Sequence, residues 1–265
     1  MNLLAVLHRN RFINSLVKWS RINKFVDFCL SNHPLIRRTR TGLVYKVGDV
    51  PSMVVANEVF GPGAYAKAVK LIAPSTFVDL GANVGYFPVL VADVVNSRQI
   101  RGLCVEPNPS LRESAIFHIT TNMLENVHFK EAAVGSDTSG AEIDFFINPS
   151  HIASSVFQKF NPLIPVGGKV QRIKVPALNV LEEWDRLFPK SRIDLLKIDI
   201  EGAEVDFLQS HSSFIERVDS VIIEWHAWVT SLHEVSRLME RYGMVLEEVY
   251  DEDQHAGTVL FRRKN

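Results

Sequence analysis

A glycine-rich turn, together with an acidic residue some way beyond it, could bind a nucleoside. The turn reads D-L-G-A-N-V-G from Asp79 to Gly85, and Glu106 ends the next apolar run. Glycine lets the backbone approach a ligand closely, and the helix that follows such a turn presents free N–H groups. An acidic residue about 20 residues or a little more beyond the turn is placed to accept both hydroxyls of a ribose. The pair therefore indicates a nucleoside site, although each part alone also fits a tight connection or a charge at a helix start.

The same turn argues against two common nucleotide-binding motifs. The dinucleotide fingerprint G-x-G-x-x-G needs a second glycine two residues after Gly81, where this chain has Asn83. The turn also lacks the Lys-Ser/Thr pair of a phosphate-binding P-loop. A nicotinamide-dependent dehydrogenase is therefore the weaker alternative.

Carboxylates and one histidine gather near the ends of two later apolar runs. They are Asp199, Glu201, Glu224 and His226. Such an oxygen-rich group with one imidazole could hold a hard divalent ion. None of these residues has the tight spacing of a zinc site, however, and we expect no metal here. Loss of activity in EDTA that magnesium restores would contradict this expectation.

The elements that must position these residues alternate regularly from about Thr76 onward. Short β-branched apolar runs alternate with helix-length segments, which is typical of a parallel sheet with crossover helices. The expected strands are Thr76–Leu80, Leu103–Glu106, Val127–Ala133, Ile193–Asp199 and Val218–Trp225. The expected helices are Tyr86–Val95, Pro109–Leu124, Asn179–Phe188, Ala203–Ser210 and Ser231–Tyr242. A hairpin of Met244–Tyr250 and Thr258–Arg262 would close the domain, and strand-like Glu142–Ile147 and Val170–Val175 would flank a long loop.

Composition excludes several classes of protein. The chain has 265 residues, of which 46% are hydrophobic and 22% are charged, and it has two cysteines. These values exclude a disordered or collagen-like chain and a small disulfide scaffold. The longest stretch without a charged residue, Phe145–Gln158, contains Pro149 and His151, so we expect no membrane-spanning helix. The apolar start precedes its basic residues, the reverse of a secretory signal, and we expect a cytoplasmic protein with reduced Cys29 and Cys104.

The near-zero net charge of −1 conceals a basic N-terminal arm. Residues 1–40 hold eight of the 29 basic residues but only one of the 30 acidic residues. On a helix, the apolar side chains Phe12, Leu16, Trp19 and Val26 would share one stripe. We therefore divide the chain into a basic amphipathic helical extension, residues 1–42, and a main domain that holds the motifs, residues 43–265. The stripe would pack on the domain, or the arm would make a weak contact with an anionic membrane surface or an acidic partner.

The string K-I-D-I-E-G-A-E at Lys197–Glu204 is the most characteristic stretch of the chain. Together with D-L-G-A-N-V-G, V-E-P-N-P, A-A-V-G and E-W-H, in this order, it resembles the methyltransferases of the FkbM family. The resemblance covers roughly residues 43–262. It implies an α/β, Rossmann-like class I methyltransferase fold, with a mostly parallel seven-stranded sheet and an antiparallel last strand. It further implies S-adenosylmethionine as cofactor.

The resemblance also implies roles for individual residues. The residues expected along the methionine and ribose parts of the cofactor are Asp79, Gly81, Asn83 and Gly85. Glu106 would bind the ribose hydroxyls, and Ala133 would flank the adenine. Asp199 and Glu201 would lie beside the transferred methyl group.

Strand alternation extends this expectation to the reacting end. It places Lys197 and Asp199 on one face of their strand, and Glu224 and His226 on one face of the next. If the two strands are neighbours, as the resemblance implies, a structural Lys197–Glu224 ion pair would lie below a catalytic Asp199–His226 pair. His226 suits the role of general base because its usual pKa is near neutrality, and Asp199 would orient it or act as the base directly.

The expected reaction is transfer of a methyl group to a hydroxyl on a sugar, glycan or polyketide-like small molecule. Alternatives are methylation of nitrogen or a carboxylate on the same fold, and a catalytically silent cofactor-binding or interaction module. We expect no nucleic-acid partner. The sequence leaves the acceptor and the oligomeric state open.

Overall fold

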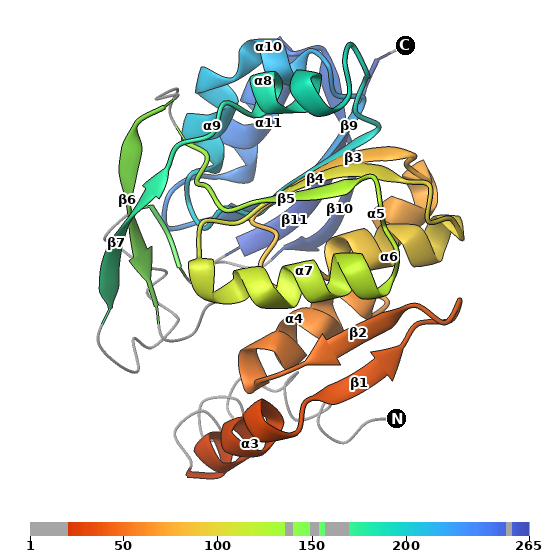
Figure 1. The fold of residues 1–265 in the computed structure, drawn as a ribbon. Coiled ribbons are helices and arrows are strands. Elements are labelled where there is room, and N and C mark those ends of the chain that lie inside the picture. The colour runs from red at the N-terminus through yellow and green to blue at the C-terminus, as the bar shows by residue number, and fades with distance from the viewer. Residues whose placement is uncertain (1–20, 136–139, 149–153, 157–169, 253–255, 265) are drawn as a thin grey trace.

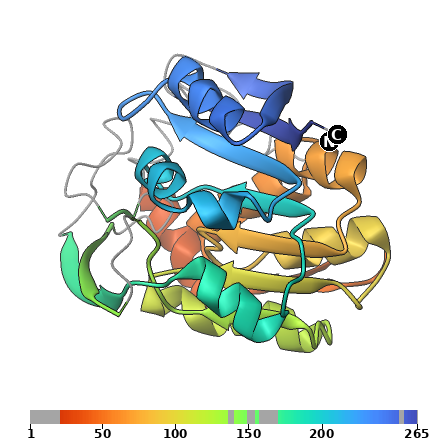
Figure 2. The same cartoon turned by 90° about the horizontal axis from the view of Figure 1, so that it is seen from above.

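The computed structural model is a central sheet between two layers of helices (Figures 1 and 2). It describes residues 21–135, 140–148, 154–156, 170–252 and 256–264, with side chains from residue 25 onward. Within these residues, no helix has both the length and the apolar character needed to cross a membrane.

Seven strands form the central sheet in the order β10, β11, β9, β8, β3, β4, β5. Their bounds are β3 (Thr76–Leu80), β4 (Arg101–Val105), β5 (Val127–Lys130), β8 (Leu195–Ile198), β9 (Ser220–His226), β10 (Met244–Glu252) and β11 (Ala256–Arg263). β11 is antiparallel to both of its neighbours, and the five strands from β9 to β5 are parallel. The predicted α/β fold, with a mostly parallel seven-stranded sheet and an antiparallel last strand, is confirmed. The strand order reverses between β3 and β8, which is where open α/β sheets bind ligands.

Helices cover both faces of this sheet. On one face lie α8 (Val180–Leu187), α9 (Glu204–Ser210), α10 (Ser212–Ile215) and α11 (Leu232–Arg241). On the other lie α5 (Ala64–Ile72), α6 (Phe87–Val95), the short 3-10 helix η1 (Pro109–Leu111) and α7 (Arg112–Thr121). Each face has its own apolar core, so the parallel strands are buried on both sides, as their nearly continuous apolar runs predicted.

Alternation along the strands decides which face each polar side chain meets. In β8, Leu196 and Ile198 belong to the core on the α9 side, whereas Leu195 belongs to the core on the α5 side. Successive side chains of a strand point to opposite faces, so Lys197 is directed to the α5 side. Asp79 lies opposite Lys197 in the neighbouring strand β3 and shares its face.

The N-terminal part of the described chain packs below α6 and α7 (Figure 1). It consists of α3 (Arg21–Asn32), β1 (Leu35–Arg38), β2 (Val44–Val47) and α4 (Val50–Phe60). β1 and β2 form an antiparallel hairpin that pairs Leu35 with Val47, so the proposed boundary at residue 42 lies inside a hydrogen-bonded unit. α4 begins after Asp49, whose carboxylate accepts a hydrogen bond from Ser52 N–H. Of the expected apolar stripe, Phe12, Leu16 and Trp19 lie outside the described residues, and Val26 lies in α3, where it is half-buried.

A second hairpin stands at one side of the sheet (Figure 1). β6 (Glu142–Ile147) and β7 (Gln171–Pro176) are antiparallel, close to the two predicted strand segments. The backbone of Ser155 pairs with Phe146 of β6. Most of the expected long loop between these strands lies outside the described residues.

Candidate active site

A cavity opens at the carboxyl ends of β3, β4, β8 and β9. It holds about 1240 Å³ of empty space, including the space at its open mouth. Its wall combines residues of these strands with α4, α5 and the β6 hairpin. Among the predicted site residues, those that line it are Asp79, Gly81, Asn83, Glu106, Ala133, Lys197, Asp199, Glu201, Glu224 and His226.

The glycine-rich turn follows β3 and is shaped by close packing. Gly81 has φ +77°, and a Cβ atom there would lie 1.7 Å from the carbonyl oxygen of Asp199. Gly85 has φ +81°, and a Cβ atom there would lie 2.8 Å from Cα of Ala115. Gly85 therefore packs against α7 and is not a lining residue of the cavity. Glycine at both positions is required by the positive φ and by the close approach of a neighbouring backbone.

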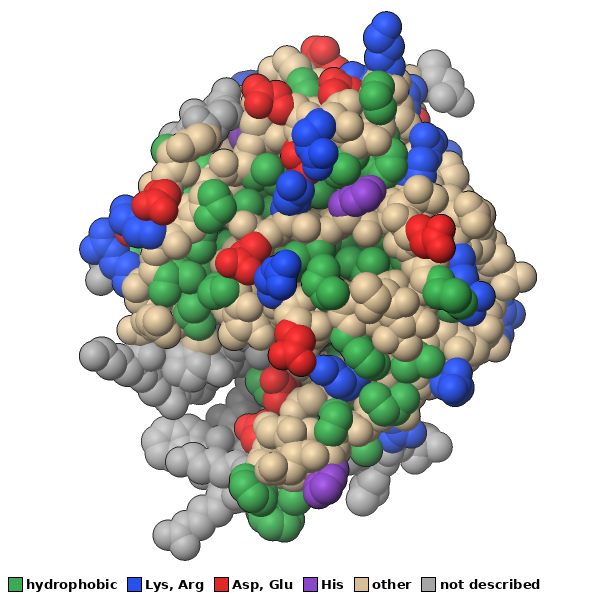
Figure 3. Space-filling view, in the orientation of Figure 1, with side chains coloured by type: hydrophobic (Ala, Val, Ile, Leu, Met, Phe, Trp, Pro, Cys, Tyr) green, Lys and Arg blue, Asp and Glu red, His purple; other side chains and the backbone are tan. Residues whose placement is uncertain are grey.

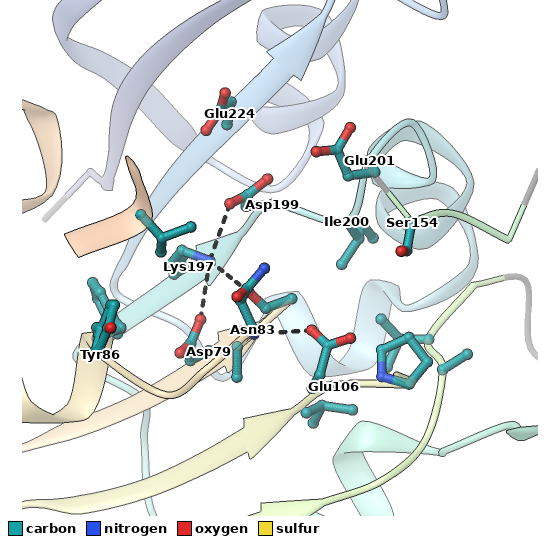
Figure 4. Close-up of a pocket in the computed structure, with 18 of the residues that line it drawn as sticks. Asp79, Asn83, Tyr86, Glu106, Ser154, Lys197, Asp199, Ile200, Glu201 and Glu224 are labelled. Atoms are coloured by element: carbon teal, nitrogen blue, oxygen red, sulfur yellow. Dashed lines mark hydrogen bonds and ion pairs between the residues drawn. The ribbon is translucent and has the colours of Figure 1, made fainter. Parts of the chain in front are cut away.

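Glu106 holds this turn from the end of β4 (Figure 4). Its two carboxylate oxygens accept hydrogen bonds from Asn83 N–H and Asn108 N–H, each at 2.9 Å. The carboxylate is therefore fixed at the cavity wall beside the glycine-rich turn. Ala133, after β5, is 1% exposed and lines the same end of the cavity. This end combines the acidic group and the apolar wall that a nucleoside needs.

The buried Lys197 has partners other than the expected one. Its Nζ lies 3.1 Å from Asp79 Oδ1 and 3.4 Å from Asp199 Oδ2, and it donates to the carbonyl of Gly81 at 3.0 Å. Burial alone would lower the pKa of Lys197, but Asp79 and Asp199 hold it above its usual value. The lysine therefore remains charged and ties β8 to the turn after β3.

The expected Lys197–Glu224 ion pair is wrong, and strand register is the reason. β8 and β9 pair with Lys197 opposite Ile222, so Glu224 lies two residues further along β9, beside the end of β8. No short turn connects two parallel strands, so no turn fixes their register. Shifting one strand by two residues keeps every side chain on the same face, so the alternation of the two sequences allows either register.

Tyr65 of α5 reaches the carboxylates that the shifted register brings together. Its hydroxyl lies 3.1 Å from Glu224 Oε2 and 3.4 Å from Asp199 Oδ2, and the side chain is fully buried. Burial and the neighbouring charge of Asp199 raise the pKa of Glu224 to about 7. Burial and the same two carboxylates raise the pKa of Tyr65 well above its usual value, so its hydroxyl keeps its proton and donates it. Sequence reasoning missed Tyr65, because no element was predicted for the segment before β3.

His226 ends β9 between two glutamates. Its Nδ1 lies 3.3 Å from Glu204 Oε1, and its Nε2 lies 3.6 Å from Glu201 Oε2. Burial lowers the pKa of His226, but the contact with Glu204 and the charges of Glu201 and Glu224 outweigh this and raise it well above its usual value. The expectation of a histidine that titrates near neutrality is therefore wrong. The main reason that the pKa is raised is Glu204, a buried residue of the K-I-D-I-E-G-A-E string for which the sequence predicted no role.

Asp199 and His226 lie near each other, although the register that was expected to pair them directly is wrong. One donor atom each of Asp199, Glu201 and His226 lies within 4.8 Å of the others. Glu201 adopts φ +50°, unusual for a residue other than glycine, and its carbonyl accepts a hydrogen bond from Ser155 Oγ at 2.8 Å. Figure 4 shows Asp199, Glu201 and Glu224 along one side of the cavity and Glu106 with Asn83 on the other. We call the part with Glu106 and Asn83 the nucleoside end, after its expected ligand, and the part with Asp199, Glu201 and Glu224 the acidic end.

Comparison with known families gives one match. Residues 79–246, more than half of the chain, match the methyltransferase FkbM domain. No curated protein matches the sequence.

Several solved structures are similar to this chain. Methyltransferase FkbM from Methylobacillus flagellatus is 15% identical with a TM-score of 0.46, covering 71% of this chain and 44% of that one. TYW2 of M. jannaschii, solved in complex with AdoMet, is 14% identical with a TM-score of 0.38, covering 87% of each chain. The Methanococcus jannaschii fibrillarin pre-rRNA processing protein is 12% identical with a TM-score of 0.49, covering 87% of this chain and 83% of that one.

Proposed function

Because this chain belongs to the FkbM methyltransferase family, we propose that it methylates a hydroxyl on a sugar, glycan or polyketide-like small molecule. The chain is a methyltransferase that uses S-adenosylmethionine. When bound, this cofactor supplies an electrophilic methyl group. The observation that carries the proposal is the acidic end of the cavity, where Asp199 lies among polar groups able to orient a hydroxyl and accept its proton.

The nucleoside end of the cavity fits the cofactor. Glu106 would hold the ribose hydroxyls, because its carboxylate is fixed by backbone N–H groups and faces the cavity. Gly81 and Asn83 would lie along the methionine and ribose, and Ala133 would lie against the adenine. Asp79 would act indirectly, since its carboxylate contacts Lys197 within the sheet.

Asp199 is the better placed of the two candidates for general base. Its side chain is 24% exposed at the cavity, whereas that of His226 is 3% exposed and is enclosed by glutamates. Lys197 and the Tyr65 hydroxyl hold Asp199 from one side, and the acceptor would approach from the other. A base fixed in this way typically contributes about a hundred- to ten-thousand-fold to the rate.

A labelling experiment tests the proposed reaction. The full-length protein is incubated with methyl-labelled cofactor and a panel of glycans, polyketides and RNA, and the labelled products are identified by mass spectrometry. We expect label on a hydroxyl oxygen, lost in Asp199→Asn and retained in Glu113→Gln, which changes an exposed carboxylate on α7. Label on nitrogen, on a carboxylate or on RNA would overturn the choice of acceptor. Cofactor binding without any transfer would favour a silent module.

The charge distribution on one face of the molecule supports a small acceptor. On the face shown in Figure 3, acidic and basic side chains are interspersed, whereas nucleic-acid-binding proteins gather basic side chains into a patch or stripe. We also propose a cytoplasmic location, because Cys29 and Cys104 are both free thiols. The weak contact of the basic arm with a membrane surface or an acidic partner remains a proposal.

A further inference from the structure

The acidic end of the cavity has far more negative than positive groups. The described charged side chains that line the cavity are Glu58, Asp79, Glu106, Lys197, Asp199, Glu201 and Glu224. Lys197, which contacts Asp79 and Asp199, is the one lysine or arginine among them, and His226 is the other described lining group that can carry a positive charge. Charged groups held close together in a partly buried site favour a ligand of opposite charge. This end of the cavity therefore favours a cation.

A buried imidazole points into the same place. His226 is 2% exposed and lines the cavity, and its Nε2 is directed towards Glu201. Its Nδ1, on the far side of the ring, makes no hydrogen bond of normal geometry and lies 3.3 Å from Glu204 Oε1. A carboxylate behind one ring nitrogen keeps a proton on that nitrogen, and an ion that binds at Nε2 would displace the proton from Nε2. Glu204 is itself fixed by the N–H groups of Gly202 and Ile200, at 3.0 and 3.3 Å.

We propose that Asp199, Glu201 and His226 form a binding site for a divalent cation of the Mg²⁺ or Mn²⁺ type. Their donor atoms lie within 4.8 Å of one another, and ligand atoms around such an ion are about 3 Å apart, so small side-chain movements suffice. Asp199 directs Oδ2 to Lys197 and Tyr65, which leaves Oδ1 for the ion. Carboxylate ligands suit Mg²⁺ and Mn²⁺, whereas structural zinc sites are usually built from cysteine thiolates and histidines.

The fold explains why the sequence favoured no metal. Asp199 and Glu201 follow β8, and His226 ends β9, so the three donors are brought together only by the pairing of these strands. The ion would lie at the part of the cavity that the proposed function assigns to the acceptor, and in this respect the inference rests on that function. The binding itself can be measured without any reaction.

Manganese is the probe for the test. The full-length protein is treated with a chelator, dialysed and titrated with Mn²⁺ at pH 7.5, and electron paramagnetic resonance measures the free ion. We expect one bound ion for each chain and ¹⁴N modulation of the bound signal, caused by the His226 imidazole. If the wild-type protein binds no Mn²⁺, or binds it without ¹⁴N modulation, the proposal is overturned by that result alone.

Matched variants assign the ligands. We expect Glu201→Gln to weaken Mn²⁺ binding more than tenfold, and His226→Gln to do the same and to abolish the ¹⁴N modulation. Glu204→Gln, at a positioning residue, should weaken binding about 10–100-fold and retain the modulation. Glu113→Gln should bind as the wild type does. Thermal melting confirms that each variant is folded, and unchanged binding in folded Glu201→Gln and His226→Gln would overturn the proposal.

The outcomes also separate this inference from the proposed function. Methyl transfer to a hydroxyl that continues in EDTA, by a protein that binds no Mn²⁺, overturns the cation site alone. Site-specific Mn²⁺ binding by a protein that labels no hydroxyl overturns the proposed acceptor and leaves the cation site standing.

Discussion

Lys197 and Asp79 lie opposite each other across the parallel strands β8 and β3, with 3.1 Å between Nζ and Oδ1. Both side chains are buried, with 5% and 0% exposure. The ion pair joins the two strands at the point where the strand order reverses, directly below the glycine-rich turn. It therefore supports the cavity floor from inside the sheet.

We expect Lys197→Met to destabilise the protein by about 3–5 kcal/mol, because it leaves the buried Asp79 carboxylate without its counter-charge. Urea unfolding followed by circular dichroism measures the change. The double variant Lys197→Met/Asp79→Asn should recover at least about 1 kcal/mol, since it removes the lone charge. Equal stability of the single and double variants would contradict this account of the pair.

We expect Tyr65→Phe to lower kcat about 10–100-fold, because it removes a hydroxyl that donates to Glu224 and lies near Asp199. Steady-state kinetics with the acceptor found by labelling measures this change, and calorimetry should give an unchanged Kd for S-adenosylhomocysteine. Tyr242→Phe is the control, since that hydroxyl donates to Leu208 O and Tyr242 is not a lining residue of the cavity. If both variants lose activity equally, Tyr65 has no special role at the site.

We expect Glu106→Gln to weaken S-adenosylhomocysteine binding about 10–100-fold, because a neutral amide replaces the charged acceptor of the ribose hydroxyls. Isothermal titration calorimetry measures this Kd, with Glu113→Gln as the exposed control. An unchanged Kd in Glu106→Gln would mean that the carboxylate only orders the turn through Asn83 and Asn108.

We expect His118 to make stability pH-dependent. It is fully buried, its Nε2 accepts a hydrogen bond from Lys46 N–H at 2.9 Å, and its Nδ1 lies 2.7 Å from Val84 O. Burial lowers the pKa of His118 to about 4. The unfolded chain binds a proton more readily, so the stability from neutral His118 is complete above about pH 6.5 and is lost as the pH falls towards 4.

The loss between pH 7.5 and 4.5 should be about 2–3 kcal/mol for this residue. Urea unfolding of the wild type and of His118→Gln at both pH values measures it, because the difference between the two proteins removes the titration of the other groups. A pH dependence that is the same in both proteins would contradict the assignment.

Local patterns predicted which residues lie at the Glu106 end of the cavity, and long-range register limited the prediction of contacts at the acidic end. Glu106 and the turn at Gly81 lie at the ends of adjacent strands, where apolar runs and glycines mark the positions. The partner of Lys197 depends on the register of β8 with β3 and β9, and the alternation of side chains does not determine this register. The position of Tyr65 in the site depends on the packing of α5, which precedes the first strand predicted from the sequence.

The N-terminal region has a consequence for how this enzyme can diversify. The matched family domain begins at residue 79, yet α4 and α5 before it contribute cavity wall through Val54, Val55, Glu58 and Tyr65. The two ends of the cavity are therefore encoded in part by separate stretches of chain. Under the proposed function, we expect substitutions in residues 50–72 to change the acceptor preference while the cofactor motifs stay constant, and we expect a chimera that exchanges this stretch between family members to transfer the preference.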